Sequence, residues 1–164
     1  AGIAALYVLR HNRIRLAVFL VTTSILGGAV DTAVKVLVNR PRPEFETQLA
    51  HAIGKSFPSG HAMSSTVVYG AVLLVFLPAL PRRSRAWVFG ATATLVLLIA
   101  FSRIALGVHF LSDVVGGIVL GLAWLAASVA AFRTWRTERG RRPTPVTEGL
   151  EPEAKADLRA SSTH

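Results

Sequence analysis

The 164-residue sequence contains no cysteine, which excludes disulfide bonds and metal sites built from thiolates. Acidic residues are also scarce, since 9 Asp and Glu stand against 18 Lys and Arg. No internal repeat is visible. What the chain does have is apolar residues: 52% are hydrophobic and the mean hydropathy is +0.49. This composition disfavours an ordinary soluble domain.

The formal net charge of +9 would suit a nucleic-acid partner, but the distribution of the basic residues does not. Arginines gather in three clusters, within 10–15, 82–85 and 133–142, and each cluster lies beside the end of an apolar run. That placement is the topology signal of membrane proteins. We therefore predict a lipid bilayer as the surroundings of the chain and no nucleic-acid binding.

Four apolar segments are each long enough to cross a bilayer, which takes about 20 helical residues. They run at about 16–38, 61–80, 86–108 and 109–132. Only helices satisfy their own backbone groups in lipid, so the predicted fold is all-α, a multi-pass transmembrane helical bundle. Residues 1–9 are apolar but too few to span, and we expect them to be the end of an earlier span.

The arginine clusters also predict the orientation in the cell membrane. With four spans, all three clusters lie on one side, which should be the cytoplasm. The irregular segment 39–60 then lies on the extracytoplasmic side. We expect a membrane domain over 1–132, followed by a polar, disordered cytoplasmic tail over 133–164.

Several ionisable residues lie in or beside the apolar spans, where such groups are costly and usually functional. They are Asp31, Lys35, Arg42, His61, Arg103, His109 and Asp113. In the four-span topology, those within the spans all fall in the extracytoplasmic half or at that end of their helices, with Asp31 deepest. Arg42 lies in the extracytoplasmic segment 39–60. The sequence thus predicts one polar cluster at that membrane face.

The residue types in this cluster suit phosphoryl transfer. Lysine and arginine bind phosphate oxygens, and the helix start at Ser59 and Gly60 offers amides to an anion. Two histidines can serve as proton donor and as nucleophile or base. Asp113 follows His109 by one helical turn, so that it could hold the imidazole in one tautomer.

Simpler interpretations exist for each residue alone. Asp113 could cap the fourth helix, and His61 could cap the second. Asp31 and Lys35 could neutralise each other, which is the interpretation we favour for Asp31. Arg103 could extend to the membrane surface. The occurrence of all these ionisable residues at one membrane face favours a functional site.

The sequence resembles the type 2 phosphatidic acid phosphatases, also called lipid phosphate phosphatases. It contains every fixed position of a three-part signature, over a stretch of about 17–125. The matching residues are Lys35, Arg42 and Pro43; Pro58, Ser59, Gly60 and His61; and Ser102, Arg103, His109 and Asp113. Members of this family usually have six membrane helices, so the resemblance implies that the four spans are the last four of six and that two helices are missing.

The resemblance also implies roles for these residues. His109 would be the nucleophile that forms a phosphohistidine, Asp113 would orient it, and His61 would protonate the leaving oxygen. The phosphate would be bound by Lys35, Arg42, Ser59, Gly60 and Arg103. No metal and no other cofactor would take part, and carboxylates are few at this face, with Glu44 and Glu46 in the loop besides Asp113.

The expected activity is hydrolysis of a lipid phosphate or diphosphate, and the sequence does not choose among substrates of the undecaprenyl diphosphate, phosphatidylglycerophosphate and phosphatidate types. One alternative is a lipid phosphotransferase that uses the same site. Another is a non-catalytic membrane transporter or scaffold, which would not need His109. Soluble haloperoxidases that bind vanadate share the signature, but the apolar spans argue against that interpretation. The oligomeric state is left open.

Overall fold

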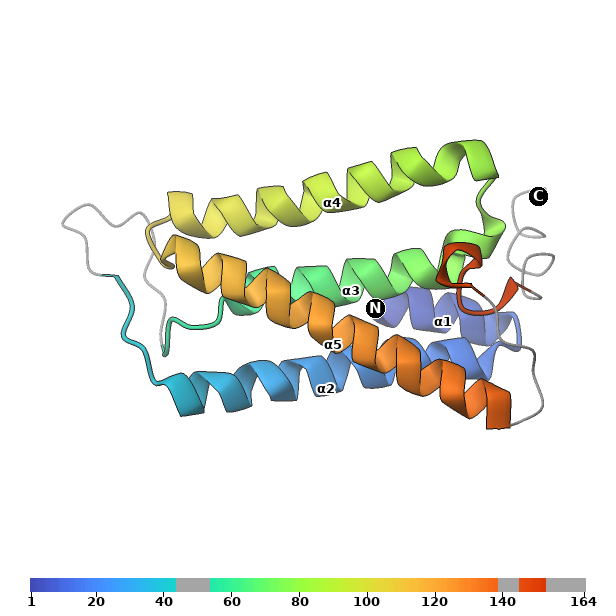
Figure 1. Cartoon of the computed structure of the whole chain (residues 1–164), viewed down its shortest axis with the longest axis horizontal. Coiled ribbons are helices and arrows are strands. Elements are labelled where there is room, and N and C mark those ends of the chain that lie inside the picture. The colour runs from blue at the N-terminus through green and yellow to red at the C-terminus, as the bar shows by residue number, and fades with distance from the viewer. Residues whose placement is uncertain (44–53, 139–144, 153–164) are drawn as a thin grey trace.

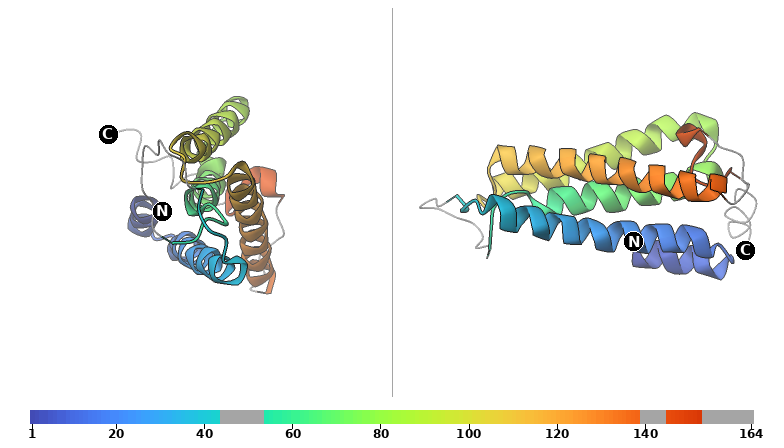
Figure 2. Two further views of the ribbon diagram at one scale, coloured as in Figure 1. Left: turned by 90° about the vertical axis from the view of Figure 1, so that its left-hand side faces the viewer. Right: turned by 60° about the horizontal axis from the view of Figure 1, so that its bottom comes forward.

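The computed structural model describes residues 1–43, 54–138 and 145–152, and every regular element among them is helical. In chain order the elements are α1 (Gly2–Arg10), α2 (Ile14–Val38), α3 (Gly60–Phe76), η1 (Leu77–Ala79), α4 (Arg82–Ala105), α5 (Leu111–Glu138) and η2 (Val146–Glu148). Helix α3 lies at the centre of the bundle and contacts α2, α4 and α5 (Figures 1 and 2). The predicted all-α bundle is confirmed.

Within the described part of the chain, four helical segments are long and apolar enough to cross a membrane: α2, α3 together with η1, α4 and α5. The predicted spans thus correspond one to one to the observed helices. Their boundaries differ by a few residues, since α4 begins at Arg82 rather than 86 and α5 continues to Glu138 rather than ending at 132. Arginine is a good helix former, so the basic residues beside the apolar runs extend the helices instead of ending them.

Glycines bring α5 close to α3. A Cβ atom on Gly117 would lie 2.7 Å from the carbonyl oxygen of Ser59, and one on Gly121 would lie 2.9 Å from the Cβ of Thr66. These separations are too short for any side chain, so the pair, spaced by four residues, permits direct contact between the two backbones. Because Ser59 immediately precedes α3, Gly117 also determines where that helix begins relative to α5.

The bundle has two unlike ends, and Figure 1 shows them at its left and right. The end of α2, the starts of α3 and α5 and the end of α4 meet on the left, which we call the histidine end. The α1–α2 and α3–α4 connections and residues 145–152 meet on the right, which we call the tail end. The larger apolar core lies towards the tail end and includes Leu16, Leu20, Val75 and Phe132.

Part of the predicted disordered tail is ordered. Residues 133–138 continue α5, and Leu150 is only 2% exposed, with its N–H directed at the carbonyl of Leu74 at 3.4 Å. Arg136 donates a hydrogen bond to the carbonyl of Leu150. The expectation was wrong here because a short polar segment can dock when one apolar side chain enters the core and a buried arginine binds its backbone. Residues 139–144 and 153–164 lie outside the described residues.

Candidate functional site

The predicted site residues come together at the histidine end from four helix termini and the segments that join them. Lys35 lies in the last turn of α2, Ser59 and Gly60 at the start of α3, and Arg103 in the last turn of α4. His61 follows in α3, Arg42 lies after α2, and His109 and Asp113 flank the start of α5. Figure 2 shows this end facing the viewer in its left panel. The convergence that the four-span topology predicts is thus observed.

His109 is buried in the turn between α4 and α5, with its two ring nitrogens in different surroundings. Nε2 lies 3.3 Å from Nη1 of Arg42, and Nδ1 lies 3.6 Å from Oδ2 of Asp113. A guanidinium can only donate hydrogen bonds, so Nε2 must accept, and in a neutral imidazole the proton is then on Nδ1. The lone pair of Nε2 therefore faces Arg42, while the N–H faces the carboxylate.

Burial lowers the pKa of His109 below its usual 6.5, and the positive charge of Arg42 lowers it further. Asp113 acts in the opposite direction but does not reverse the shift. The imidazole is therefore kept neutral over a wider pH range, which a nucleophilic nitrogen requires. Arg42 is itself held in place, because its guanidinium donates to the carbonyls of Val108 at 2.9 Å and Gly54 at 3.1 Å.

Asp113 is fully buried and accepts hydrogen bonds at both carboxylate oxygens. Oδ2 accepts from the Phe110 N–H at 2.9 Å and from the Ser56 hydroxyl, and Oδ1 accepts from Arg40 Nη1 at 2.9 Å. In the Phe110 contact, the Asp113 side chain in the first turn of α5 accepts from the backbone N–H of the residue just before the helix, as in a capping box. Capping of α5 by Asp113 is therefore confirmed, and the same carboxylate also faces His109.

The start of α3 has the features of an anion site. Ser59 is the N-cap residue, yet its hydroxyl caps no amide; Oγ is buried and has no hydrogen-bond partner among the described residues. Its backbone N–H donates to the carbonyl of Asp113 at 2.9 Å, which ties α3 to α5. A Cβ on Gly60 would lie 2.9 Å from Nζ of Lys35, so that ammonium group is next to the helix start.

Lys35 also donates a hydrogen bond to Asp31 one turn earlier. The mutually neutralising pair that the spacing favoured is confirmed. The pair lies against Gly60, because Asp31 Oδ2 would be 3.1 Å from a Cβ there. Asp31 thus shares the surroundings of the helix start and orients the ammonium group towards it.

His61 and Arg103 lie on the open side of the cluster. The side chain of His61 is exposed, and the charges of Arg103, Lys35 and Arg42 all act on its ring. Arg103 donates to the hydroxyl of its neighbour Ser102 at 3.1 and 3.0 Å, so its guanidinium is turned towards the last turn of α4. The charges of three cations therefore act together on His61, which favours an anionic ligand beside it.

Two residues that touch Asp113 were not predicted. Arg40 lies two positions before Arg42 in an Arg-Pro-Arg-Pro run, and its repetition of the Arg-Pro pair was the available signal. Ser56 lies in the irregular segment before α3, at no diagnostic spacing from another motif. Only the fold brings these two residues to the same carboxylate.

A groove of about 550 Å³ begins at Gly60 and His61 and follows one face of α3. Ser64, Ser65 and then Val68 and Tyr69 continue along the groove, and Ile99 of α4 faces it. Its lining changes from polar to largely apolar with distance from the histidine. The groove therefore joins the polar cluster to the apolar flank of the bundle.

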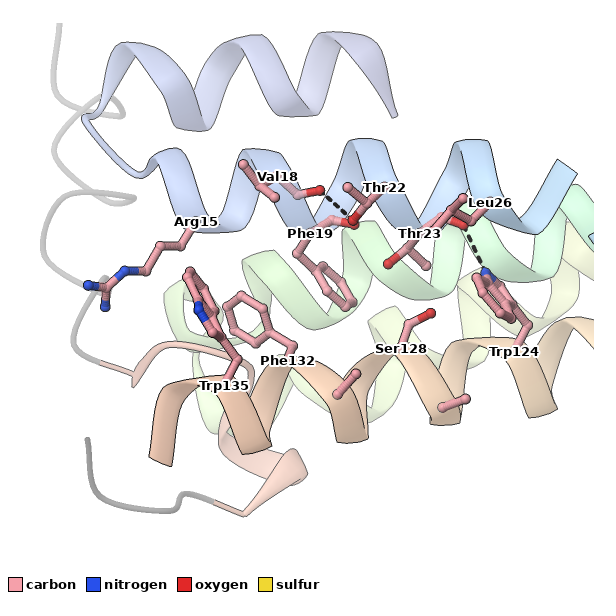
Figure 3. A pocket seen from close by; sticks show the side chains of 12 residues that line it. Arg15, Val18, Phe19, Thr22, Thr23, Leu26, Trp124, Ser128, Phe132 and Trp135 are labelled. Carbon is pink, nitrogen blue, oxygen red and sulfur yellow. Dashed lines mark hydrogen bonds between the residues drawn. The ribbon is translucent and has the colours of Figure 1, made fainter. Parts of the chain in front are cut away.

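A second groove, of about 490 Å³, lies between α2 and α5 and has a different character (Figure 3). Phe19, Phe132 and Trp135 line it, and Arg15 stacks over the Trp135 ring at 5.4 Å. No histidine or carboxylate is among its described lining residues. Among the described residues, no three His, Asp or Glu side chains form a group that could hold a metal ion at either groove.

Comparison with protein families finds one matching family model, described as the PAP2 superfamily, over residues 16–137. Phosphatidylglycerophosphatase B of Bacillus subtilis (strain 168) is 36% identical over 95 residues, 57% of this chain and 46% of that protein. A lipid A 1-phosphatase of Rhizobium etli is 28% identical over 121 residues, 68% of this chain and 48% of that protein. The chain spans about half the length of these curated relatives.

Among solved structures, the fold is similar to that of a transmembrane PAP2 type phosphatidylglycerolphosphate phosphatase from Bacillus subtilis. The TM-score is 0.66 at 28% sequence identity, and the match covers 77% of this chain and 61% of the other. The family match, over residues 16–137, includes the segment in which the histidines, the carboxylate and the cations meet.

Proposed function

The chain belongs to the PAP2 superfamily, and we propose that it hydrolyses a membrane lipid phosphate or diphosphate through a phosphohistidine on His109, without a metal ion. One observation carries this proposal: the lone pair of Nε2 faces Arg42, while Nδ1 faces a buried carboxylate. An oriented neutral imidazole beside a phosphate-binding cation is the arrangement that nucleophilic attack on phosphorus needs.

Phosphate binding is assigned to the cations and to the start of α3. Lys35, Arg42 and Arg103 provide the positive charge that Mg²⁺ would otherwise bring. Ser59 and Gly60 provide the helix-start amides. The buried Ser59 hydroxyl has no partner among the described residues and can donate a hydrogen bond to the phosphate. A phosphate bound there lies beside His61, on which the same three cations act.

The reaction proceeds in two balanced steps. His109 Nε2 forms a bond to phosphorus as the bond to the lipid oxygen breaks, and His61 gives its proton to that oxygen. A water molecule then attacks the phosphohistidine, His61 takes a proton from the water, and free phosphate leaves as His109 regains its lone pair. Asp113 holds the Nδ1 proton of His109 throughout and is not consumed.

A lipid substrate is supported by the groove that starts at His61 and runs along α3 to Tyr69. If His61 protonates the leaving oxygen, the leaving group lies on that side of the phosphate, and its apolar part can follow the groove. The names of the relatives include phosphatases of phosphatidylglycerophosphate, lipid A and, as a putative assignment, undecaprenyl diphosphate. These three lipid classes are the ones to test first.

The test is phosphate release by the purified protein from a panel of these lipid phosphates, with and without EDTA. We expect release from at least one lipid and full activity in the chelator. Loss of activity in EDTA that Mg²⁺ restores would contradict the metal-free mechanism. Transfer of the phosphate to a second lipid instead of water would indicate a phosphotransferase.

We also propose that the histidine end faces the outside of the cell, because the arginine clusters mark the other end as cytoplasmic. The absence of cysteine makes this easy to test with single-cysteine variants. Lys55→Cys at the histidine end should react with an impermeant reagent in intact cells, whereas Ser84→Cys in α4 should not. The reverse labelling would overturn the orientation.

A further inference from the structure

Arg40 and Arg42 lie two residues apart and approach the same imidazole–carboxylate pair from opposite sides. Arg42 Nη1 lies beside Nε2 of His109, where phosphorus would bind. Arg40 Nη1 lies 2.9 Å from Oδ1 of Asp113, behind the imidazole. The charge of Arg42 acts on both His61 and His109. Among the described residues, the Arg40 side chain instead donates hydrogen bonds to Asp113 and to its neighbour Ser112. The two arginines are therefore placed for different tasks.

Asp113 needs a partner such as Arg40. The carboxylate is 0% exposed, and an ionised carboxylate removed from water is strongly destabilised unless it is paired and hydrogen-bonded. Neutral donors, the Ser56 hydroxyl and the Phe110 N–H, occupy Oδ2, the oxygen that also faces His109. Arg40 supplies the cation at Oδ1 and leaves Oδ2 directed at the imidazole.

Arg40 is itself held firmly in this position. Its Nη1 also donates to the Ser112 hydroxyl at 2.7 Å, and its guanidinium lies 4.3 Å from the centre of the Phe110 ring. Its carbonyl accepts from the Ser56 N–H at 2.9 Å, so the two segments that bring donors to Asp113 are joined by their backbones. The guanidinium is thus positioned by both α5 and the segment that precedes α3.

We propose that Arg40 is a positioning residue of the reaction, which acts on His109 through Asp113 and takes no part in phosphate binding. The proposal rests on the proposed function, because it concerns the nucleophile of that reaction. It predicts that Arg40 affects the rate of phosphoenzyme formation and not the affinity for phosphate. It further predicts that this effect requires the charge of Asp113.

The test is a double-mutant cycle on the purified protein with p-nitrophenyl phosphate. The variants are Arg40→Gln, Asp113→Asn and their combination, with Arg40→Lys as the conservative replacement. Arg85→Gln is the matched control, because Arg85 is also a hydrogen-bonded arginine, but it donates to the backbone carbonyl of Thr147 at the tail end. Single-turnover formation of the phosphoenzyme is measured, so that a slow variant still yields a rate. Inhibition by inorganic phosphate reports on binding.

We expect Arg40→Gln to slow phosphoenzyme formation about 10- to 100-fold, as when the outer partner of a ligating histidine is removed. Its inhibition constant for phosphate should stay near the wild-type value, whereas Arg42→Gln should raise it. Arg40→Lys should recover part of the rate, and Arg85→Gln should stay within about twofold of wild type. In the Asp113→Asn background, Arg40→Gln should have little further effect.

An equal loss from Arg40→Gln in both backgrounds would overturn the proposal, and so would weaker phosphate inhibition without a change in rate. If Arg40→Gln does not fold, Arg40→Lys takes its place in the double-mutant cycle. An unchanged rate of phosphoenzyme formation in Arg40→Lys would then indicate that the role of Arg40 is purely structural. If the wild-type protein releases no phosphate from any substrate, the proposed function fails. If it is active and the cycle is additive, the role of Arg40 alone fails.

Discussion

The two ends of the bundle both carry arginines that donate to backbone carbonyls, but the pair formed by His109 and the fully buried Asp113 is contacted by arginines of the histidine end. At the histidine end Arg40 and Arg42 contact a buried carboxylate and an imidazole. At the tail end Arg85 and Arg136 donate to the backbone carbonyls of Thr147 and Leu150. The first arrangement organises ionisable side chains around one position, whereas the second attaches a segment of chain to a core. Arginine content alone therefore does not distinguish a site from an anchor.

The apolar core is divided just as unequally. Most of the large buried side chains, such as Leu16 and Leu20, belong to the cluster towards the tail end. The cluster nearer the histidines consists of Ala62, Ala100 and Val114, which are small. We infer that the tail end contributes more to stability and that the histidine end gives up apolar packing for a polar network. Substitutions at each end should separate the two contributions.

The largest effect should come from His109→Ala. Removal of the nucleophile should abolish the covalent intermediate and lower turnover by several orders of magnitude, on the order of 10⁴- to 10⁶-fold. Thermal unfolding should be little changed. Phosphate release and trapping of the phosphoenzyme measure the effect. Retention of substantial turnover would point to another nucleophile.

His61→Ala should have the next largest effect, and its size should depend on the substrate. Loss of a general acid lowers the rate by about 10²- to 10⁴-fold when the leaving group is a poor one. p-Nitrophenolate needs little protonation, so the defect should shrink on p-nitrophenyl phosphate, while that of His109→Ala should not. Equal losses on both substrates would show that acid and nucleophile are wrongly assigned.

Gly117→Ala tests the contact between α5 and the start of α3. The new Cβ would lie 2.7 Å from the Ser59 carbonyl, so the backbone at the phosphate site must move. A displacement of this kind could lower kcat/KM about 10²-fold. Gly90→Ala is the matched control, since a Cβ there meets no atom within 4 Å. Similar activities for the two variants would argue against a role for this contact in the site.

Leu16→Ala should show the opposite behaviour. Leu16 is fully buried at the tail end, and truncation of such a side chain costs about 2–5 kcal/mol of unfolding free energy. The activity of the folded fraction should be unchanged, because the residue lies far along α2 from the histidines. Ile14→Ala, at a position that is 62% exposed, should have a small effect on both quantities. Loss of kcat in Leu16→Ala at full stability would show that the ends are coupled.

The smallest effect expected is a displacement of the pH profile. Since burial and Arg42 lower the pKa of His109, the acidic limb of kcat/KM should lie below pH 6.5. Arg42→Gln removes a charge that lowers this pKa, so the limb should move towards neutral pH. Asp113→Asn removes the group that raises it, so the limb should move to lower pH. Displacements in the opposite directions would contradict this electrostatic description.

The sequence by itself determined the helices and which residues belong to the candidate site. Apolar runs in lipid must be helical, and the ionisable residues within them fall at one end of every span, so His61, Arg103 and His109 could be brought together without coordinates. The family signature added the same residues independently. The start of α3 was also predictable, because Ser59 and Gly60 precede an apolar run.

Only the tertiary structure decided which groups touch. Arg40 and Ser56 were missed because each reaches Asp113 from a segment without periodicity, so no spacing in the sequence relates them to α5. The docking of Leu150 was missed because one apolar side chain in a polar segment is no signal until a core with room for it exists. Periodicity and lipid solvation act along one helix and are readable from the sequence, whereas contacts between distant segments depend on how the helices pack.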